Sequence, residues 1–155
     1  MPKQAVPDVL KKVIVLEHVQ DPGNVGTVIR TGNALGMDAV ILAGNCASLY
    51  GAKTARAAMG ASFRQCVLEM SSEEAVALLH THHLKVYGAA LSNRAVDVRT
   101  VCLDDAAFVV GSEGQGLSAE MLGLCDGEVI IPMQPGSESL NAGGAASILM
   151  WELAR

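Results

Sequence analysis

Phe108-Val109-Val110 runs directly into Gly111-Ser112-Glu113-Gly114-Gln115-Gly116-Leu117-Ser118 near the middle of the C-terminal half of the chain. A short apolar run followed by a glycine-rich loop predicts a buried strand that ends in exposed backbone. A second run at 128–133 enters a Pro/Gly/Ser loop at 134–141, and a closing helix is expected at 140–154. Ligands bind at the carboxyl ends of strands in open α/β sheets, so these two loops predict a cofactor site.

Apolar runs alternate with helical patterns along the rest of the chain. Strands are expected at residues 13–16, 39–42, 65–68 and 85–90, with helices at 25–35, 52–59 and 71–79. The third of these helices opens with Ser71 and Glu74 at the spacing of a capping box. Residues 91–105 form a polar connection without a strong pattern. This order predicts an α/β fold with a mostly parallel sheet flanked by helices, in a single domain over residues 1–155.

Composition narrows the class of protein. Half of the 155 residues are hydrophobic and 17% are charged, which excludes disorder, and no apolar run approaches the roughly 18 residues needed to span a bilayer. The chain opens on polar residues rather than a signal peptide, so we expect a cytoplasmic protein with no membrane partner. The net charge of −5 is the wrong sign for a surface that grips phosphate as a whole, so any contact with nucleic acid must be local.

Cysteine and histidine spacing predicts no metal. The four cysteines are widely spread with no Cys-x-x-Cys pair, which favours packed, reduced thiols over a zinc site or disulfides. His80, His82 and His83 cluster near a predicted helix end. Placement at the negative end of the helix dipole explains them better than a metal does.

Each candidate motif has a structural explanation when it is taken alone. Asn24 and Ser118 fit helix caps, and a single arginine such as Arg30 fits a solvated helix face. Gly114-x-Gly116 formally matches the dinucleotide fingerprint, but its strand comes late in the chain. A dinucleotide site also needs an acidic residue at the end of a following strand to bind the ribose, and Glu128 opens a strand instead. No Gly-Lys-Ser/Thr occurs, which excludes a Walker loop.

In combination, the motifs resemble those of one family. Residues 21–30, 109–118 and 131–141 are similar to the three motifs of SpoU-type, TrmH-like RNA ribose 2′-O-methyltransferases of the SPOUT superfamily. Residues 53–63 resemble the segment between that family's first and second motifs, and the resemblance extends from Val13 onward. It implies a SPOUT α/β-knot with a C-terminal trefoil knot, a bent S-adenosylmethionine as cofactor, and a homodimer.

The resemblance also implies a role for individual residues. Seven positions are expected at the cofactor. Gly111, Ile131 and Leu140 would contact it, and Met133, Ala89, Ala90 and Leu91 would lie nearby. The implied catalytic residues are Arg30, Asn24, Glu113, Ser139 and Asn141. Arg30 would face the target ribose, either positioning and polarising it or acting as a base, and Glu113 would orient Arg30 or Asn24. Ser139 and Asn141 would hydrogen-bond the substrate or the amino-acid end of the cofactor.

Substrate binding is expected to rest on a small basic strip. Lys53, Arg56 and Arg64, together with Arg30, would contact RNA phosphates on an otherwise acidic protein. The resulting prediction is S-adenosylmethionine-dependent methylation of a ribose 2′-hydroxyl in tRNA or rRNA. The alternatives are a non-catalytic module that binds S-adenosylmethionine or RNA, and an NAD-binding α/β domain.

Two departures from the family pattern stand out. Residues 142–145 read Ala-Gly-Gly-Ala where family members usually continue with a Val-Ser-Val-Ala-like run, which bears on the packing of the knot or of the dimer. Many members also carry an N-terminal RNA-recognition domain. Here the catalytic domain begins almost at Met1, as expected for a minimal enzyme or for a fragment of a longer one.

Overall fold

A seven-stranded sheet forms the centre of the molecule. In the computed structural model, which describes residues 5–61, 64–137 and 140–155, the sheet order is β3-β2-β1-β6-β4-β7-β5. The strands are β1 (Lys12–Glu17), β2 (Ala39–Ala43), β3 (Val67–Met70), β4 (Lys85–Ala89), β5 (Val96–Asp97), β6 (Ala106–Val110) and β7 (Gly127–Ile130). Every described strand pair is parallel, so the expected α/β class is confirmed.

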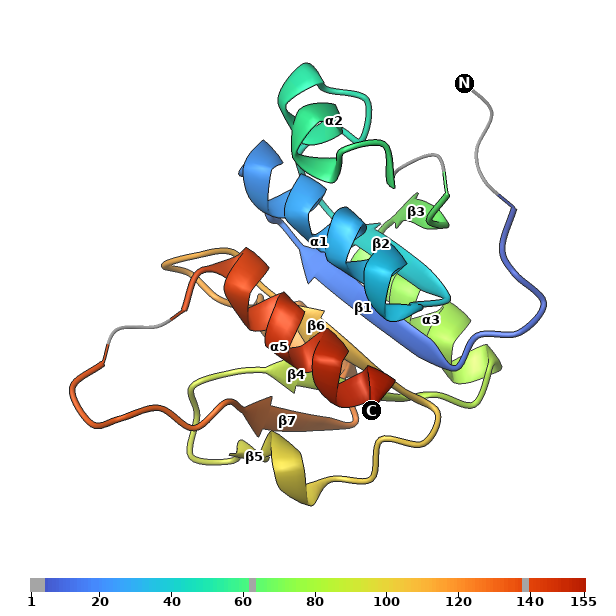
Figure 1. Ribbon diagram of the computed structural model, residues 1–155. Coiled ribbons are helices and arrows are strands. Elements are labelled where there is room, and N and C mark those ends of the chain that lie inside the picture. Colours follow the sequence, from blue (N-terminus) through green and yellow to red (C-terminus); the bar gives the residue numbers. More distant parts are fainter. Residues whose placement is uncertain (1–4, 62–63, 138–139) are drawn as a thin grey trace.

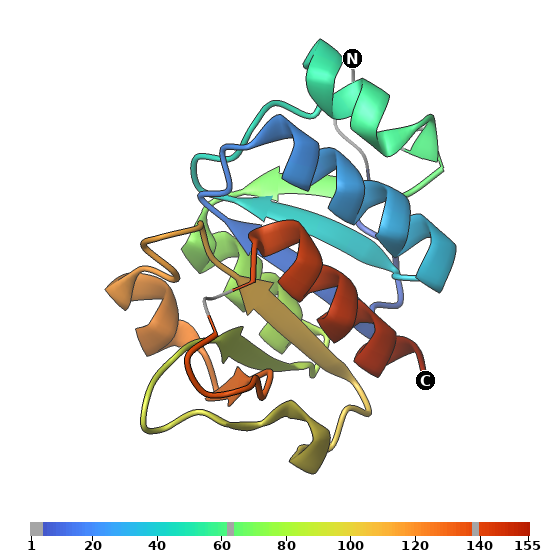
Figure 2. The ribbon, with the colours of Figure 1, turned by 60° about the vertical axis from the view of Figure 1, so that its left-hand side comes forward.

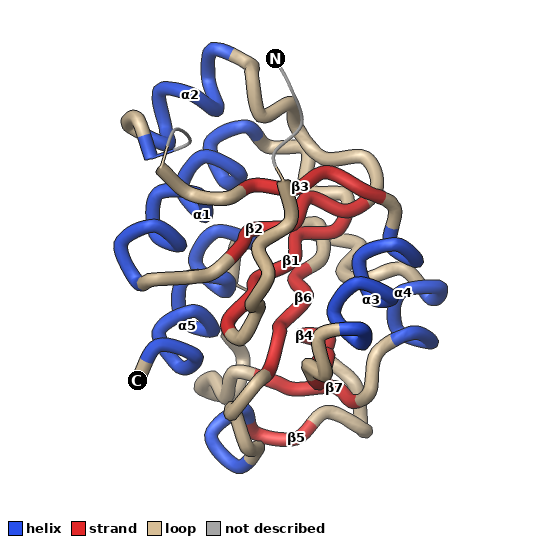
Figure 3. The backbone as a smooth tube through the Cα atoms, turned by 90° about the vertical axis from the view of Figure 1, so that its right-hand side faces the viewer, coloured by secondary structure: helices blue, strands red, loops and turns tan. Residues whose placement is uncertain are grey.

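Helices cover both faces of the sheet. They are α1 (Pro22–Leu35), α2 (Ala52–Ala58), α3 (Ser72–Thr81), α4 (Ala119–Leu124) and α5 (Ala142–Ala154). Helices α1 and α5 lie side by side on one face with α2 packed on α1, while α3 and α4 cover the other face (Figures 1 and 3). Side chains alternate along each central strand, so Ile14 and Phe108 join the core under α1 and α5, while Val13 and Val109 join the core under α3 and α4.

The start of α1 differs from the sequence prediction. The helix begins at Pro22, and its cap is Asp21, whose Oδ1 accepts hydrogen bonds from the backbone N–H of Gly23 at 2.8 Å and of Asn24 at 3.3 Å. Proline fits the first helical position because its missing N–H would be unpaired there in any case. Asn24 is therefore not the cap, and its side chain is left for other contacts.

Other boundaries follow the sequence closely. The capping box of Ser71 and Glu74 is present in both directions, and Ser118 caps α4 as expected. The connection at 91–105 contains β5 and the 3₁₀ helix η2 (Val98–Thr100), which the sequence did not predict. A strand of two residues is too short to show an alternating pattern.

The small residues at the start of α5 are used inside the fold. Ala142, Gly143 and Ala146 are buried where α5 packs beside α1 (Figure 2). A methyl group added at Gly143 would lie 2.9 Å from Oδ1 of Asn24, so this glycine allows the two helices to approach. Within the departure at 142–145, Ala142 and Gly143 thus serve the contact between α1 and α5. The trefoil knot stays a prediction, since residues 138–139 of the preceding loop lie outside the described part of the chain.

Candidate active site

A cavity of about 390 Å³ opens at the carboxyl ends of β4, β6 and β7, and we call it the β7 cavity. It is walled by the loops that follow these strands and by the start of α5. All seven residues expected at the cofactor line it, namely Ala89, Ala90, Leu91, Gly111, Ile131, Met133 and Leu140. Its volume lies within the roughly 300–1,000 Å³ typical of ligand sites. The fold therefore gathers positions from three distant segments around one space.

The glycine-rich loop after β6 forms one wall through its backbone. A side chain at Gly111 would overlap the carbonyl group of Gly116, because the loop folds back onto the end of the strand. The N–H of Gly116 donates to the carbonyl of Ser112 at 2.8 Å, and Gly114 and Gly116 have left-handed φ values of 82° and 67°. Glycine adopts such values without strain. At its glycines the loop thus presents peptide groups to a ligand.

The charge in the β7 cavity is negative. Glu113 and Glu128 line it, and none of the described residues around it is lysine or arginine. Glu128 accepts a hydrogen bond from the hydroxyl of Ser92 at 2.6 Å, while Nε of the mostly exposed Arg94 lies 4.0 Å from its other oxygen. Because Glu128 opens a strand, the sequence alone assigned it no role in ligand binding. The pairing of β7 with β4 sets it opposite Gly88, and from there it reaches the cavity.

A second cavity of about 680 Å³ lies beside the first, beyond the end of β1, and we call it the β1 cavity. The two cavities share the wall formed by Ser112, Glu113, Gln115, Gly116, Leu117 and Ala142. At this shared wall, Nδ2 of Asn24 donates a hydrogen bond to Oε1 of Glu113 at 2.8 Å. Two of the five expected catalytic residues are thereby brought together.

The other three expected catalytic residues are placed differently. Arg30 is exposed on α1, outside the lining of both cavities, and makes no hydrogen bond or ion pair with any residue in the described ranges. Asn141 caps α5, with its Oδ1 accepting from the N–H of Gly144 at 2.6 Å. Ser139 lies outside the described residues. Within one chain, the structure does not bring Arg30 to the pair of Asn24 and Glu113.

The expected RNA-contacting residues are exposed on and next to α2. Lys53 and Arg56 are exposed on α2, and Arg64 is exposed in the turn that follows it. Helix α2 packs tightly on α1 at Gly26, where a side chain would overlap the carbonyl oxygen of Thr54. Arg30 follows Gly26 by four residues and so lies on the side of α1 that meets α2. The four basic residues share one part of the molecule, and their contact with RNA stays a prediction.

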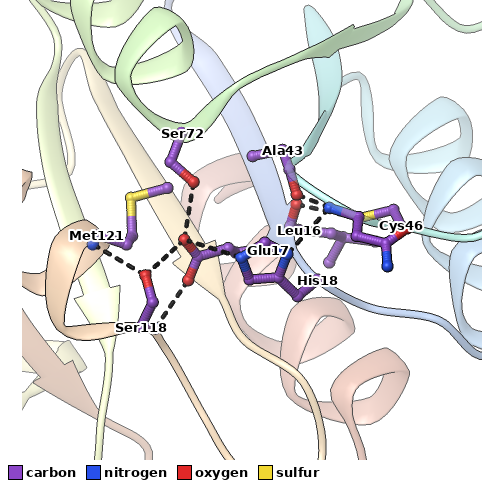
Figure 4. Close-up of polar contacts among 9 residues, drawn as sticks. Leu16, Glu17, His18, Ala43, Cys46, Ser72, Ser118 and Met121 are labelled. Carbon is purple, nitrogen blue, oxygen red and sulfur yellow. Dashed lines mark hydrogen bonds and ion pairs between the residues drawn. The ribbon is translucent and has the colours of Figure 1, made fainter.

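Glu17 is a site residue that the sequence argument missed. It ends β1 with 1% of its surface exposed (Figure 4). Its Oε1 accepts from the backbone N–H of Ser118 at 2.9 Å, and its Oε2 accepts from the hydroxyls of Ser118 at 2.8 Å and Ser72 at 2.7 Å. These bonds hold the far end of the glycine-rich loop to the central strand. The available signal was an acidic residue at the end of a wholly apolar run.

Burial governs the chemistry of two cysteine side chains. Burial raises the pKa of Cys46, and burial together with the carboxylates of Asp126, Glu17 and Glu128 raises the pKa of Cys125 to about 12. Both side chains are therefore neutral thiols at ordinary pH.

Across the described residues, no group of three or more His, Cys, Asp or Glu side chains gathers to hold a metal ion. No helix in the same part of the chain has the length and hydropathy to cross a bilayer. A cytoplasmic location stays a prediction.

Comparison with known proteins decides the family. The sequence model of the SpoU rRNA Methylase family matches residues 11–151. The chain belongs to this family. Its resemblance to SpoU-type enzymes, first drawn from three motifs, is thereby confirmed over nearly the whole length.

Individual relatives within the SpoU family agree with this assignment. The chain is 39% identical over 143 residues to the 23S rRNA (guanosine(2553)-2′-O)-methyltransferase RlmP of Bacillus subtilis, covering 92% of this chain and 58% of that protein. The SpoU methyltransferase AviRb of Streptomyces viridochromogenes, solved in complex with AdoMet, superposes with a TM-score of 0.89 at 28% identity, over 100% of this chain and 65% of that one. An AdoMet-bound rRNA methyltransferase from Sinorhizobium meliloti superposes with a TM-score of 0.89 at 27% identity, over 98% of this chain and 60% of that one. This SpoU chain thus spans about 58% of the B. subtilis relative's length.

Proposed function

We propose that this chain transfers a methyl group from S-adenosylmethionine to a ribose 2′-hydroxyl of RNA. The observation that carries the proposal is the β7 cavity, where all seven cofactor positions implied by the SpoU motifs meet. Ribosomal RNA is the favoured substrate class, because the B. subtilis relative is named for a guanosine of 23S rRNA. Transfer RNA is the second candidate.

The charge of the β7 cavity favours this cofactor over NAD. S-adenosylmethionine carries a positive sulfonium, and the titratable groups among the described lining residues are Glu113 and Glu128. The diphosphate of NAD would meet these carboxylates with no lysine or arginine from the described lining beside it. A bound S-adenosylmethionine would supply the methyl group: the ribose oxygen would bond to the methyl carbon, the carbon–sulfur bond would break with its electron pair kept by the sulfur, and the hydroxyl proton would be released to water. The product is a neutral thioether, which the two carboxylates hold less strongly.

Asn24 and Glu113 are proposed to orient the reacting ribose. Their hydrogen bond lies in the wall between the two cavities, so a nucleotide in the β1 cavity would meet a cofactor in the β7 cavity beside them. Glu113 fixes the amide of Asn24, and Gly143 leaves room for it. A preset amide lowers the entropic cost of holding the hydroxyl in line with the methyl group.

Arg30 is proposed to act on the RNA backbone. The planar fork of donors on an exposed guanidinium suits a phosphate next to the target ribose better than it suits proton abstraction. Lys53, Arg56 and Arg64 would extend this contact along α2. Ser139 and Asn141 keep the roles that the resemblance implies, at the substrate or the amino-acid end of the cofactor.

A homodimer is proposed to form through the outer side of α5. Gly144, Ile148, Trp151 and Arg155 recur at three- and four-residue intervals and are all exposed, with 58% of the surface of Trp151 accessible. Large aromatic side chains are enriched at the centres of protein interfaces. The small residues on the other side of α5 already pack against α1, so the outer side is the one that remains for a partner.

Calorimetric titration of the purified chain with S-adenosylmethionine and with NAD tests the cofactor assignment. The expected result is saturable binding of about one S-adenosylmethionine per chain with no heat from NAD. Binding of NAD alone would overturn the proposal. Binding of S-adenosylmethionine without methyl transfer to ribosomal or transfer RNA would favour a non-catalytic binding module.

A further inference from the structure

His18 follows β1 and has an unusual backbone conformation. Its φ is 54°, which few residues other than glycine adopt, and its imidazole ring packs over Gly44 so closely that any side chain there would overlap it. The side chain is about half exposed and lines the β1 cavity. Strained residues of this kind concentrate at functional sites, since the surrounding fold must hold them in place.

The hydrogen bonds around His18 fix which ring nitrogen carries the proton. Nδ1 accepts a hydrogen bond from the backbone N–H of Asn45 at 2.9 Å, so the proton of the neutral ring is on Nε2. Nε2 lies 3.9 Å from Oε2 of Glu17, a contact that Figure 4 draws as a dashed line. This separation is within the range of an ion pair but beyond hydrogen-bond distance. That oxygen already accepts from the hydroxyls of Ser72 and Ser118. No residue in the described ranges accepts a hydrogen bond from Nε2, so its N–H is left for a ligand in the β1 cavity.

The lining of the β1 cavity suits a nucleobase rather than a phosphate. It consists largely of side chains that donate and accept neutral hydrogen bonds, which are His18, Gln20, Asn24, Asn45, Ser112, Gln115 and Ser118. Its charged groups are the carboxylates of Asp21 and Glu113, and none of the described lining residues is lysine or arginine. A phosphate would meet repulsion here. Unstacked RNA bases are recognised by this kind of polar pocket and by stacking on flat side chains such as histidine.

We propose that the β1 cavity holds the base of the nucleotide to be methylated, and that His18 donates a hydrogen bond from Nε2 to an acceptor on that base. The base would then lie across the wall of Asn24 and Glu113 from the cofactor. This inference rests on the proposed function and adds to it a residue that selects the target. His18 contacts substrate in this account and takes no part in proton transfer.

The backbone of His18 permits an unusually clean test. Glycine adopts a φ of 54° without strain, so His18→Gly removes the ring and relieves the backbone at the same time. His83 is a matched control, because it is also exposed, has a φ of 64° and lies outside both cavities. His18→Asn tolerates the same backbone and keeps an amide donor, so it should recover part of any lost activity.

The assay measures methyl transfer by the 155-residue chain to in-vitro transcripts of 23S rRNA and tRNA, with the modified position mapped by mass spectrometry. Transcripts with each of the four bases at that position are then compared. For His18→Gly we expect kcat/KM to fall about tenfold or more, mainly through KM, and the preference for one base to shrink. The dissociation constant for S-adenosylmethionine should change less than about twofold, and His83→Gly should match wild type.

The outcomes separate this inference from the function on which it rests. If wild type methylates RNA and His18→Gly retains its KM, kcat and base preference, the role of His18 is overturned and the proposed function stands. If His18→Gly and His83→Gly lose activity equally, the effect belongs to the backbone change and the inference is again overturned. If wild type methylates neither class of RNA, the proposed function and this inference fall together.

Discussion

Glu17 and Ser118 are joined by two hydrogen bonds although 101 residues separate them in the chain. The carboxylate of Glu17 accepts from the backbone N–H of Ser118 at 2.9 Å and from its hydroxyl at 2.8 Å. The same hydroxyl oxygen accepts from the N–H of Met121 and so caps α4. One buried carboxylate thus ties the glycine-rich loop, the start of α4 and the end of β1 together, next to both cavities.

Replacing Glu17 by glutamine should destabilise the chain and weaken cofactor binding. The amide cannot accept from all three donors that meet the carboxylate, so we expect a loss of about 1–3 kcal/mol in the free energy of unfolding. Urea denaturation measures it. Glu69→Gln, at an exposed position on β3, should leave stability within about 0.5 kcal/mol of wild type. Equal effects of the two substitutions would contradict the role of Glu17.

Gly111→Ala should weaken cofactor binding. The added methyl group would overlap the backbone of Gly116, so the loop must move away from the cavity wall that it forms. We expect the affinity for S-adenosylmethionine to fall at least about tenfold, with a stability loss of about 1–3 kcal/mol. Gly123→Ala is the control, since nothing lies within 4 Å of the new methyl group in α4. That change should stabilise the helix by about 0.5–1 kcal/mol and leave binding intact.

Glu128→Gln should weaken binding of the substrate cofactor more than binding of its product. Removing this carboxylate from the β7 cavity removes attraction for the sulfonium, which S-adenosylhomocysteine lacks. We expect a three- to tenfold loss (about 0.7–1.4 kcal/mol) for S-adenosylmethionine and a smaller loss for the product, both measured by calorimetry. Glu120→Gln, exposed on α4 outside the cavity, should change neither affinity. Equal losses for the two ligands would argue against a role of charge.

Trp151→Glu should convert a homodimer into monomers. A charge at the centre of the exposed side of α5 would have to be buried without a partner, which costs several kcal/mol. Size-exclusion chromatography with light scattering measures the mass of the particle. Val9→Glu places the same charge at another exposed apolar residue and should leave the dimer intact. A monomeric wild type would refute the proposed interface.

Asp126 should make the free energy of unfolding depend on pH in the acidic range. Burial raises its pKa, but hydrogen bonds from the N–H of Val86 and from His80 outweigh burial and hold the pKa below the ordinary value of 3.8. A carboxyl whose pKa is lowered by folding stabilises the protein above its unfolded pKa and loses that contribution as the pH falls through the folded pKa. Asp126→Asn should therefore be less stable than wild type at about pH 6, with the gap narrowing toward about pH 2.5. The exposed Asp8→Asn should show no such convergence.

Much of the fold followed from the sequence because local patterns coincide with the long-range arrangement. The unbroken apolar runs of β1, β2 and β6 could be recognised because central parallel strands are buried on both faces. The capping box at Ser71 and Glu74 fixed the start of α3 from side-chain chemistry alone. The two-residue strand β5 gave no signal, since its pairing with β7 depends on a neighbour more than 30 residues away.

The site was predictable where it uses backbone and was missed where it uses distant side-chain pairs. Glycines mark close backbone approaches, so the loop at Gly111 was found from sequence. Glu17 and Glu128 were passed over because nothing local shows that one meets Ser118 and the other Ser92. Arg30 belongs to the first SpoU motif, yet only the structure shows that it lies outside both cavities of its own chain.

Transfer of a labelled methyl group to RNA is the decisive measurement for the proposed activity. The chain is incubated with S-adenosylmethionine carrying a CD₃ group and with unmodified ribosomal and transfer RNA, and each RNA is digested to nucleosides for mass spectrometry. We expect CD₃ on the ribose of one nucleoside, with much less label when Gly111→Ala replaces wild type at the same concentration of S-adenosylmethionine. Label on a base instead of a ribose, or no label under conditions where S-adenosylmethionine saturates the chain, would contradict it.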